Sequence, residues 1–354
     1  MVTIKEIAEK LNLSPATVSR TLSNDETLSI KPETRYMIVS TATEMGYVSR
    51  KKKKRAKKET SILIIHKHTT FRKQIDSSYY YTMRSGVEDI CAKSNLSYSF
   101  REIDQLDGKK ITANGVLLLG NYSREQFQTL LPLLGDLPAV VVGNAIFYKN
   151  RFNRVSFSNH DSVATGLAYL FKNGHSRIGY FGIEEQEGTS RLDSRRETFI
   201  TMMKERNLFR SEWLLEDTHG TDRVEQGYHM AEKLLTQQRL PTAVFCANDS
   251  VAIGAINCFT ESGVRVPGDI SILAHDGSYP TQYAIPPITT VDVHPYQLGT
   301  EGTRLLQNRI ENPVDYTCEI LLTPRLIVRK SVAARPEKQE RERQERKTSD
   351  TAIS

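Results

Sequence analysis

Apolar and polar residues alternate at helical spacing over the first part of the chain. Apolar side chains recur every three or four positions from Ile4 to Leu11, which predicts a helix with one apolar face. Ser14-Pro15 combines a good N-cap with a proline at the first helical position, so we expect a second helix there. A third helical pattern follows over residues 32–45. Two short helices joined by a tight turn and followed by a third predict a helix-turn-helix head over residues 1–49.

From residue 61 onward, short apolar runs alternate with longer segments of helical periodicity. The predicted strands are 61–65, 116–119, 139–142, 178–181, 243–247 and 271–274. The predicted helices include 82–94, 161–173, 194–206, 224–237 and 250–262. Strands separated by helices in this way indicate an α/β fold with parallel sheets covered on both faces. The strands are too many for one compact sheet, so we expect two lobes.

Net positive charge is concentrated at the start of the chain. Residues 1–58 contain 13 Lys and Arg against 6 Asp and Glu, whereas the remainder contains 35 basic and 36 acidic residues. Eight of the nine residues from Arg50 to Lys58 are basic, so residues 50–60 form a basic linker. A small basic head on a near-neutral body indicates a polyanionic partner for the head.

Several protein classes are excluded by the same sequence. No apolar run approaches the roughly 20 residues of a membrane span, and the chain starts with an amphipathic pattern instead of a secretory signal. We therefore expect a cytoplasmic protein without a membrane partner. The four cysteines are far apart and form no CxxC motif, so they are expected to be buried thiols. We predict no metal site and no cofactor.

The exposed face of the second predicted helix carries short side chains with a single long one, Arg20. Such a helix enters a major groove closely, where an arginine can bind guanine O6 and N7 together. Hydroxyl groups and helix N-termini suit phosphates. The predicted DNA contacts of the head are Thr3, Ser14, Pro15, Ala16, Thr17, Ser19 and Arg20. The alternative is a three-helix interaction module whose charged face is merely solvated.

The head resembles a known family. The segment TIKEIAEKLNLSPATVSRTLS followed by KPETRYMIVSTATEMGY is similar to the head of LacI/GalR-type bacterial transcription regulators. This resemblance implies a homodimer that binds double-stranded operator DNA. In the family the linker folds into a hinge helix on DNA, and a leucine wedges into the minor groove. Here Ala56 stands in place of that leucine and Lys53 in place of a small residue, and both are counted among the predicted DNA contacts. The other interpretation of the linker is a solvated tether.

The resemblance extends over the body to about residue 330. The segments YLFKNGHSRIGYFG, CANDSVAIGAI, VPGDISILAHDG and YAIPPITTVDVHPYQLG match those of the family. It implies a core like that of periplasmic binding proteins, with two Rossmann-like lobes and three crossovers, over residues 61–332. Lobe one then comprises about 61–160 and 291–319, and lobe two about 161–290 and 320–332. Residues 333–354 mix both charge signs without apolar periodicity, which predicts a disordered tail.

The family's effector site can be carried over residue by residue. Arg195, Asn248 and Asp276 stand at the positions of three sugar-hydroxyl partners. A guanidinium, an amide and a carboxylate can each bridge adjacent hydroxyls. Asp276 could instead cap a turn, and Asp249 is expected to be the N-cap of the next helix. Tyr79 opens the first body helix, where it could stack on a pyranose ring or pack between lobes or across a dimer.

These observations predict a repressor of a carbohydrate operon, released from DNA by a small sugar such as galactose or a galactoside. The chain is not expected to be an enzyme. The alternative is an enzyme-derived sugar regulator with kinase-like activity, but neither GxGxxG nor GxxxxGK[ST] occurs in the sequence. A further alternative is an activator or global regulator with a non-sugar effector, such as a nucleobase or a phosphorylated protein.

Overall fold

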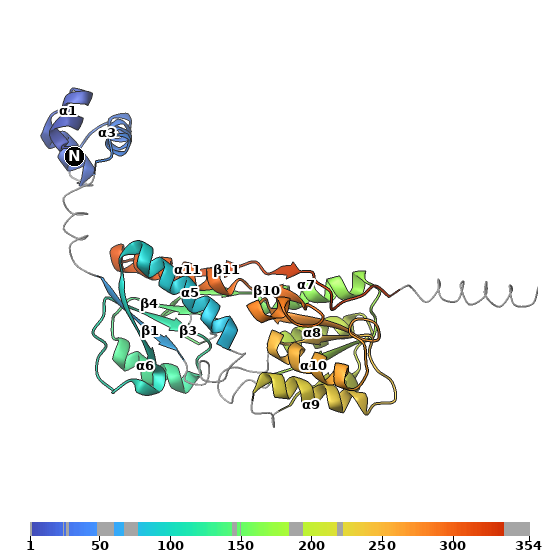
Figure 1. The fold of residues 1–354 in the computed structure, drawn as a ribbon. Coiled ribbons are helices and arrows are strands. Elements are labelled where there is room, and N and C mark those ends of the chain that lie inside the picture. Colours follow the sequence, from blue (N-terminus) through green and yellow to red (C-terminus); the bar gives the residue numbers. More distant parts are fainter. Residues whose placement is uncertain are drawn as a thin grey trace, which may run out of the picture. The chain divides into compact units, whose positions relative to one another are not determined.

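The structure of the protein is a computed structural model of its 354 residues. It describes residues 2–23, 25, 28–47, 60–66, 77–143, 147–148, 150–183, 194–217 and 222–335. The chain divides into two compact units, Met1–Thr60 and Ser61–Ser354 (Figure 1). The predicted linker contacts Lys53 and Ala56 lie outside the described residues, as do residues 336–354 of the predicted tail.

The first unit contains the three expected helices, which are α1 (Ile4–Leu11), α2 (Pro15–Leu22) and α3 (Pro32–Glu44). The hydroxyl of Thr3 accepts a hydrogen bond from the backbone of Glu6, whose carboxylate accepts one from Thr3, and this capping box begins α1. Each helix contributes to a small apolar core. Its buried members are Ile7, Ala8, Val18, Ile38 and Ala42. The helix-turn-helix prediction for the head is confirmed.

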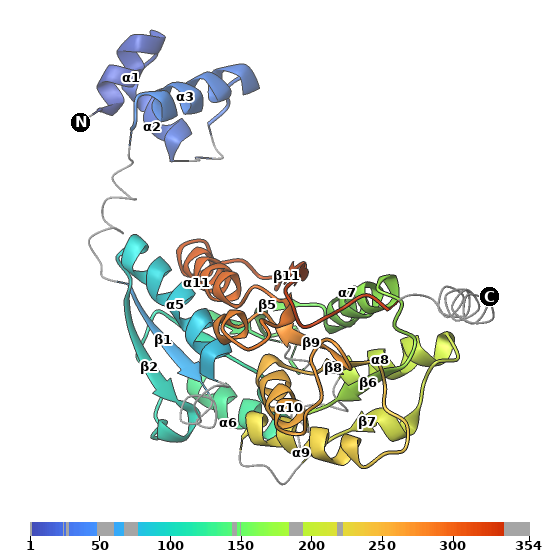
Figure 2. The ribbon, with the colours of Figure 1, turned by 45° about the vertical axis from the view of Figure 1, so that its right-hand side comes forward.

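The second unit contains two six-stranded sheets, each with helices on both faces (Figures 1 and 2). The first sheet has the order β11-β5-β4-β3-β1-β2, and all its neighbouring strands are parallel. Its strands are β1 (Ser61–His66), β2 (Ser97–Glu102), β3 (Gly115–Leu119), β4 (Ala139–Val142), β5 (Asn153–Phe157) and β11 (Glu319–Leu322). Helices α5 (Ser77–Ser94) and α11 (Pro295–Glu311) cover one face, and α6 (Arg124–Leu134) covers the other.

The second sheet has the order β12-β10-β9-β8-β6-β7, with only β12 antiparallel to its neighbour among the described strands. Its strands are β6 (Ile178–Phe181), β7 (Leu214–Leu215), β8 (Ala243–Cys246), β9 (Ser271–Asp276), β10 (Thr289–Asp292) and β12 (Arg325–Ile327). Helices α7 (Asn159–Lys172) and α8 (Ser194–Glu205) cover one face, and α9 (Arg223–Leu235) and α10 (Asp249–Glu261) the other. The predicted α/β architecture with two parallel sheets is therefore confirmed.

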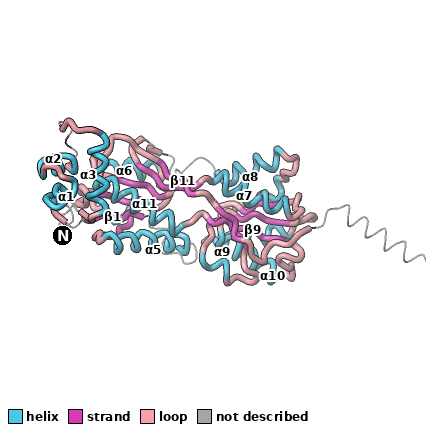
Figure 3. The backbone as a smooth tube through the Cα atoms, turned by 90° about the horizontal axis from the view of Figure 1, so that it is seen from above, coloured by secondary structure: helices cyan, strands magenta, loops and turns pink. Residues whose placement is uncertain are grey.

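The chain crosses between the two sheets three times (Figure 3). The crossings lie between β5 and α7, between β10 and α11, and between β11 and β12. The last two fall a few residues beyond the predicted lobe limits at 291 and 320, because β10 and β11 stay hydrogen-bonded to their own sheets to Asp292 and Leu322. Each sheet is therefore assembled from segments far apart in the sequence.

Candidate DNA-binding face and effector site

The side chains of the head that the sequence assigns to DNA lie at the start of α1, where Thr3 is the N-cap, and on α2 with its N-cap Ser14. Thr3, Ser14, Pro15, Ala16 and Arg20 are exposed, and Thr17 and Ser19 are half-buried. The Ser14 hydroxyl accepts a hydrogen bond from the Thr17 backbone at 3.0 Å and lies 2.8 Å from the Thr17 hydroxyl. These groups therefore order the start of α2, where backbone N–H groups favour an anion. All seven head residues remain predicted contacts.

Arg20 is held by a residue that the sequence reasoning did not single out. Its Nε lies 2.7 Å from Oδ2 of Asp25 in the loop after α2, and the two side chains are 46% and 30% exposed. An acidic residue five positions after an arginine gives little sequence signal, because such pairs are common on solvated loops. The ion pair restricts the one long side chain on this face.

In the body, three predicted effector residues from different elements lie within electrostatic reach of one another. Tyr79 is on α5 of the first lobe, Arg195 is in the first turn of α8, and Asp276 ends β9 in the second lobe. Burial raises the pKa of Tyr79 well above its ordinary value, the charge of Asp276 raises it further, and the guanidinium of Arg195 lowers it. The charges of Asp276 and Arg195, both in the second lobe, therefore act on a phenol of the first lobe.

Backbone contacts fix the guanidinium of Arg195. Its side chain is buried, and Nη1 donates a 2.8 Å hydrogen bond to the carbonyl of Ala247, directly after β8. Ala247 immediately precedes Asn248, so Arg195 is tied to the loop that carries another predicted effector residue. A buried guanidinium in this position has a fixed orientation, which hydroxyl recognition requires.

Asn248, and not Asp249, is the N-cap of α10. Oδ1 of Asn248 accepts a 2.8 Å hydrogen bond from the Val251 backbone, so Asn248 is the N-cap of α10 and the cap prediction for Asp249 is wrong. Asp249 is instead buried, and its carboxyl oxygens lie 2.6 Å from the backbone nitrogen of Ser278 and 2.6 Å from the hydroxyl of Thr290. Burial and the charge of Asp276 raise its pKa to about 8.

A tight turn at Asp276 and Gly277 orients the Asp276 side chain. Asp276 has a φ of 110° and Gly277 a φ of 75°, both in the region that side chains rarely adopt. A Cβ on Gly277 would lie 2.7 Å from Cα of Asp292 on the neighbouring strand, so only glycine fits. Oδ1 of Asp276 lies 2.8 Å from Nδ1 of the buried His275. Asp276 lies at a strand end, as the sequence predicted, whereas the sequence assigned no role in effector binding to His275.

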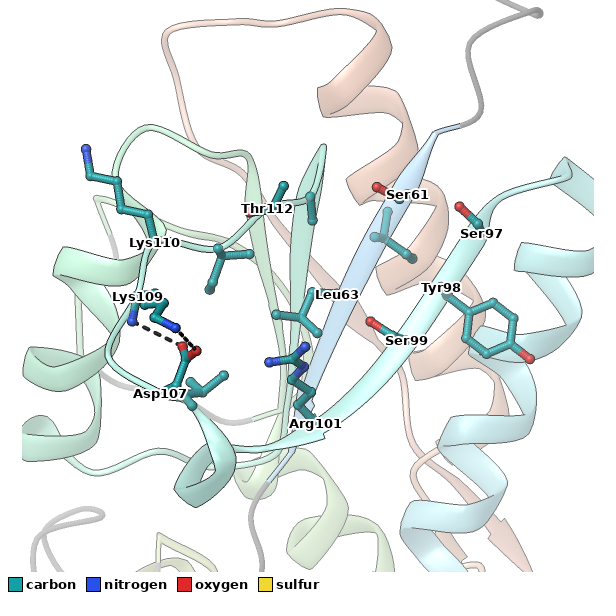
Figure 4. Close-up of a pocket in the computed structure, with 14 residues that line it drawn as sticks. Ser61, Leu63, Ser97, Tyr98, Ser99, Arg101, Asp107, Lys109, Lys110 and Thr112 are labelled. Atoms are coloured by element: carbon teal, nitrogen blue, oxygen red, sulfur yellow. Dashed lines mark hydrogen bonds and ion pairs between the residues drawn. The ribbon is translucent and has the colours of Figure 1, made fainter.

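A separate hollow lies at the amino-terminal ends of β1 and β2 in the first sheet (Figure 4). It is open, has a volume of about 440 Å³, and is lined by the first residues of β1 and β2 and by the loop before β3, where Asp107 pairs with Lys109. Ligands of parallel sheets bind beyond the carboxyl ends of strands. None of the four predicted effector residues lines this hollow, so it is distinct from the candidate effector site.

The described residues contain neither a metal-binding cluster nor a helix that could span a membrane. No group of three or more His, Cys, Asp and Glu side chains in the described ranges could hold a metal ion. No helix in the same part of the chain is both long and apolar enough to cross a membrane.

Two family models match the chain, in the same order as its two units. Residues 3–49 match "Bacterial regulatory proteins, lacI family", and residues 167–332 match "Periplasmic binding protein-like domain". A curated relative, the HTH-type transcriptional repressor MelR of Bacillus subtilis, is 30% identical over 94% of this chain and 97% of its own length.

Solved structures share the fold. A complex of the transcriptional regulator CelR with cellobiose superposes with a TM-score of 0.64 at 22% identity, covering 94% of this chain and all of that one. The lac repressor dimer bound to operator and the anti-inducer ONPF gives a TM-score of 0.64 at 19% identity, covering 94% of this chain and 99% of that one.

Proposed function

The chain belongs to the lacI family of bacterial regulatory proteins, and from this we propose that it is a dimeric repressor of a carbohydrate operon that a small sugar releases from its operator. The family consists of DNA-binding transcription regulators, not enzymes. The operon and the sugar are the new parts of the proposal. A galactose- or galactoside-type sugar is the effector we put forward.

The observation that carries the proposal is the electrostatic interaction of Tyr79 in one lobe with Arg195 and Asp276 in the other. A sugar offers neighbouring hydroxyls that both donate and accept hydrogen bonds. The guanidinium donates, the carboxylate accepts, and the phenol ring offers a face for the pyranose. The amide nitrogen of Asn248 adds a donor, since its oxygen caps α10. The cellobiose complex of CelR, which has the same fold, supports a sugar in this class of site.

On the DNA side, the proposed dimer presents two heads to a two-fold symmetric operator. A dimer of helix-turn-helix heads contacts two half-sites about one helical turn apart. The lac repressor dimer on its operator supports this assembly. Thr3, Ser14 and Thr17 are proposed to contact phosphates, and Arg20 a guanine. The basic linker adds attraction that falls with salt.

A sugar changes DNA affinity only through its different affinities for the two states of the protein, typically about 1–3 kcal/mol of coupling. The proposed site joins α5 of one lobe to α8 and β9 of the other. A ligand held there favours one arrangement of the lobes, and we propose that this arrangement spaces the two heads poorly for the operator.

Thermal unfolding of the purified protein with galactose, lactose, cellobiose, sugar phosphates and purines tests the effector class. We expect a sugar to raise the midpoint of unfolding, because a ligand that binds only the folded state stabilises it. The same sugar should release operator DNA in a gel-shift titration. A shift given by purines alone would contradict the proposal, and so would a sugar that stabilises the protein without affecting DNA binding.

A further inference from the structure

His275 joins the predicted effector carboxylate to the second lobe's first helix. The imidazole is fully buried, with Nδ1 2.8 Å from Oδ1 of Asp276 and Nε2 2.8 Å from Oγ of Ser162 on α7. The Ser162 hydroxyl in turn donates a 2.8 Å hydrogen bond to the carbonyl of Asn159. Asn159 is the first residue of α7, directly after the crossing from β5. A continuous chain of hydrogen bonds thus runs from the effector site to an interlobe crossing.

The hydrogen-bond partners of His275 determine which of its two ring nitrogens carry a proton. A carboxylate only accepts hydrogen bonds, so Asp276 requires a proton on Nδ1. The single hydroxyl proton of Ser162 is directed at Asn159, so its oxygen accepts from a proton on Nε2. A neutral ring protonated on Nδ1 satisfies both contacts only if the Ser162 hydroxyl turns from Asn159 to Nε2. With the hydroxyl proton on Asn159, both contacts are met by the imidazolium form of the ring, paired with an ionised Asp276.

The charges around the ring are consistent with this pairing. Asp249 on α10 is the neighbouring carboxyl, and burial together with the charge of Asp276 raises its pKa to about 8, so that it retains its proton at neutral pH. Asp292 on β10 is neutralised by Arg325, 3.0 Å away. Arg195 on α8 and the neutral Tyr79 on α5 face Asp276. The ring of Phe157 on β5 covers the imidazole at a centroid distance of 5.8 Å.

We propose that His275 is a doubly protonated positioning residue that holds the carboxylate of Asp276 for the effector and links it, through Ser162, to the crossing before α7. The role of Asp276 in this statement rests on the proposed function. A neutral ring has one donor for two acceptors. On deprotonation, either Asp276 loses its donor or the Ser162 hydroxyl turns from Asn159 to the ring. Effector affinity is therefore expected to fall as pH rises and the imidazolium is lost.

The protonation state is tested first, without any sugar. Long-range ¹H–¹⁵N spectra of the full-length protein distinguish an imidazolium from either neutral tautomer, and His275→Asn identifies the signal by its loss. We expect both ring nitrogens of His275 to be protonated at neutral pH. We also expect Ser162→Ala to make the ring lose a proton at lower pH, because one acceptor is removed. A neutral ring at neutral pH overturns the proposal.

Two matched substitutions then test the contacts of the two ring nitrogens independently. His275→Asn places an amide near the position of Nδ1 and retains a donor for Asp276, whereas His275→Gln places it near Nε2 and retains only the contact with Ser162. With galactose and cellobiose as probes, we expect the dissociation constant of the bound sugar to rise about tenfold in His275→Gln at neutral pH. His275→Asn should keep near-normal affinity but lose the pH dependence. Circular dichroism confirms that each variant is folded.

The outcomes separate this inference from the proposed function. An imidazolium signal in a protein that binds neither sugar upholds the His275 assignment and counts against the sugar proposal. Sugar binding with the same affinity and pH profile in wild type, His275→Asn and His275→Gln overturns the positioning role while leaving the sugar proposal intact.

Discussion

The guanidinium of Arg20 and the carboxylate of Asp25 form an ion pair in the head, with Nε 2.7 Å from Oδ2. The arginine predicted to read a base is therefore oriented by the loop that follows its own helix. Because both side chains are partly exposed to solvent, the ion pair contributes at most about 1 kcal/mol to stability. A guanine of the operator can therefore replace Asp25 as the partner of Arg20.

Replacing Arg20 with alanine should reduce operator affinity by about 1–3 kcal/mol while changing affinity for random DNA little. Asp25→Asn releases the side chain and is expected to lower the ratio of operator to random affinity by severalfold at most. Fluorescence anisotropy with operator and scrambled duplexes at one fixed salt concentration measures both. An unchanged ratio in Arg20→Ala would remove this residue from base recognition.

Arg195→Ala should leave operator binding near the wild-type level and abolish release by sugar. Its guanidinium is buried beside the Ala247 carbonyl, so its loss leaves hydroxyls or neighbouring polar groups unpaired, at about 1–3 kcal/mol. The matched control is Arg196→Ala on the same helix, which removes an ion pair with Glu216 at 3.1 Å. Operator titrations with and without galactose compare the two variants. Release from Arg195→Ala at the wild-type sugar concentration would place the effector elsewhere.

Asp249 should make the folded state less stable as pH rises. Its pKa is raised to about 8, above the roughly 3.9 of an unfolded chain, so the folded state binds the extra proton and stability falls between these two values. Asp249→Asn cannot ionise, and its amide oxygen can still accept from the Ser278 backbone, whereas the Thr290 hydroxyl, which donates to Oδ1 of Asp249, then faces the amide nitrogen. Urea unfolding across this pH range should show a flatter profile for the variant. Parallel profiles would mean that Asp249 is ionised throughout.

Gly277→Ala should destabilise the body and disturb the effector site together. The new Cβ would lie 2.7 Å from the Cα of Asp292, in addition to the strain of a φ of 75°. Gly263→Ala is the matched control, with a φ of 73° and no atom within 4 Å of the new Cβ. We expect about 1–2 kcal/mol of destabilisation in the control, from backbone strain alone, and a larger loss in Gly277→Ala. Equal losses, measured by urea unfolding, would show that the turn relaxes.

Six strands could be predicted because their residues are apolar on both faces. Strands β5 and β10 are also buried but were missed, because polar residues interrupt their apolar runs, NRVSF and TTVD. β2 was missed because it is an edge strand whose exposed residues interrupt the apolar run, as the pattern SYSFRE shows. Helix α11 was missed because Gly299 and Gly302 weaken its helical pattern. Both glycines serve packing: a Cβ on Gly299 would lie 2.0 Å from the Met83 carbonyl on α5, and one on Gly302 would lie 2.3 Å from Val142 on β4.

The sequence predicted individual residues of the candidate site but not how the fold arranges them. Arg195 and Asp276 follow from segments that match the family, and their convergence with Tyr79 depends on two lobes that no local pattern describes. Asp25 and His275 act through a partner that is brought close by the fold. No sequence motif surrounds either residue, so only the three-dimensional structure shows that Asp25 pairs with Arg20 and that His275 contacts Asp276.

The crossing between β11 and β12 has a consequence for synthesis on the ribosome. Among the described strands these two are the last in the sequence, and they complete the edges of different sheets, beside β5 and β10. A nascent chain that stops before Glu319 has a finished head but two open sheet edges, which can pair with other chains. Translation of residues 319–327 therefore decides whether a DNA-binding head is joined to two completed sheets or to two open sheet edges.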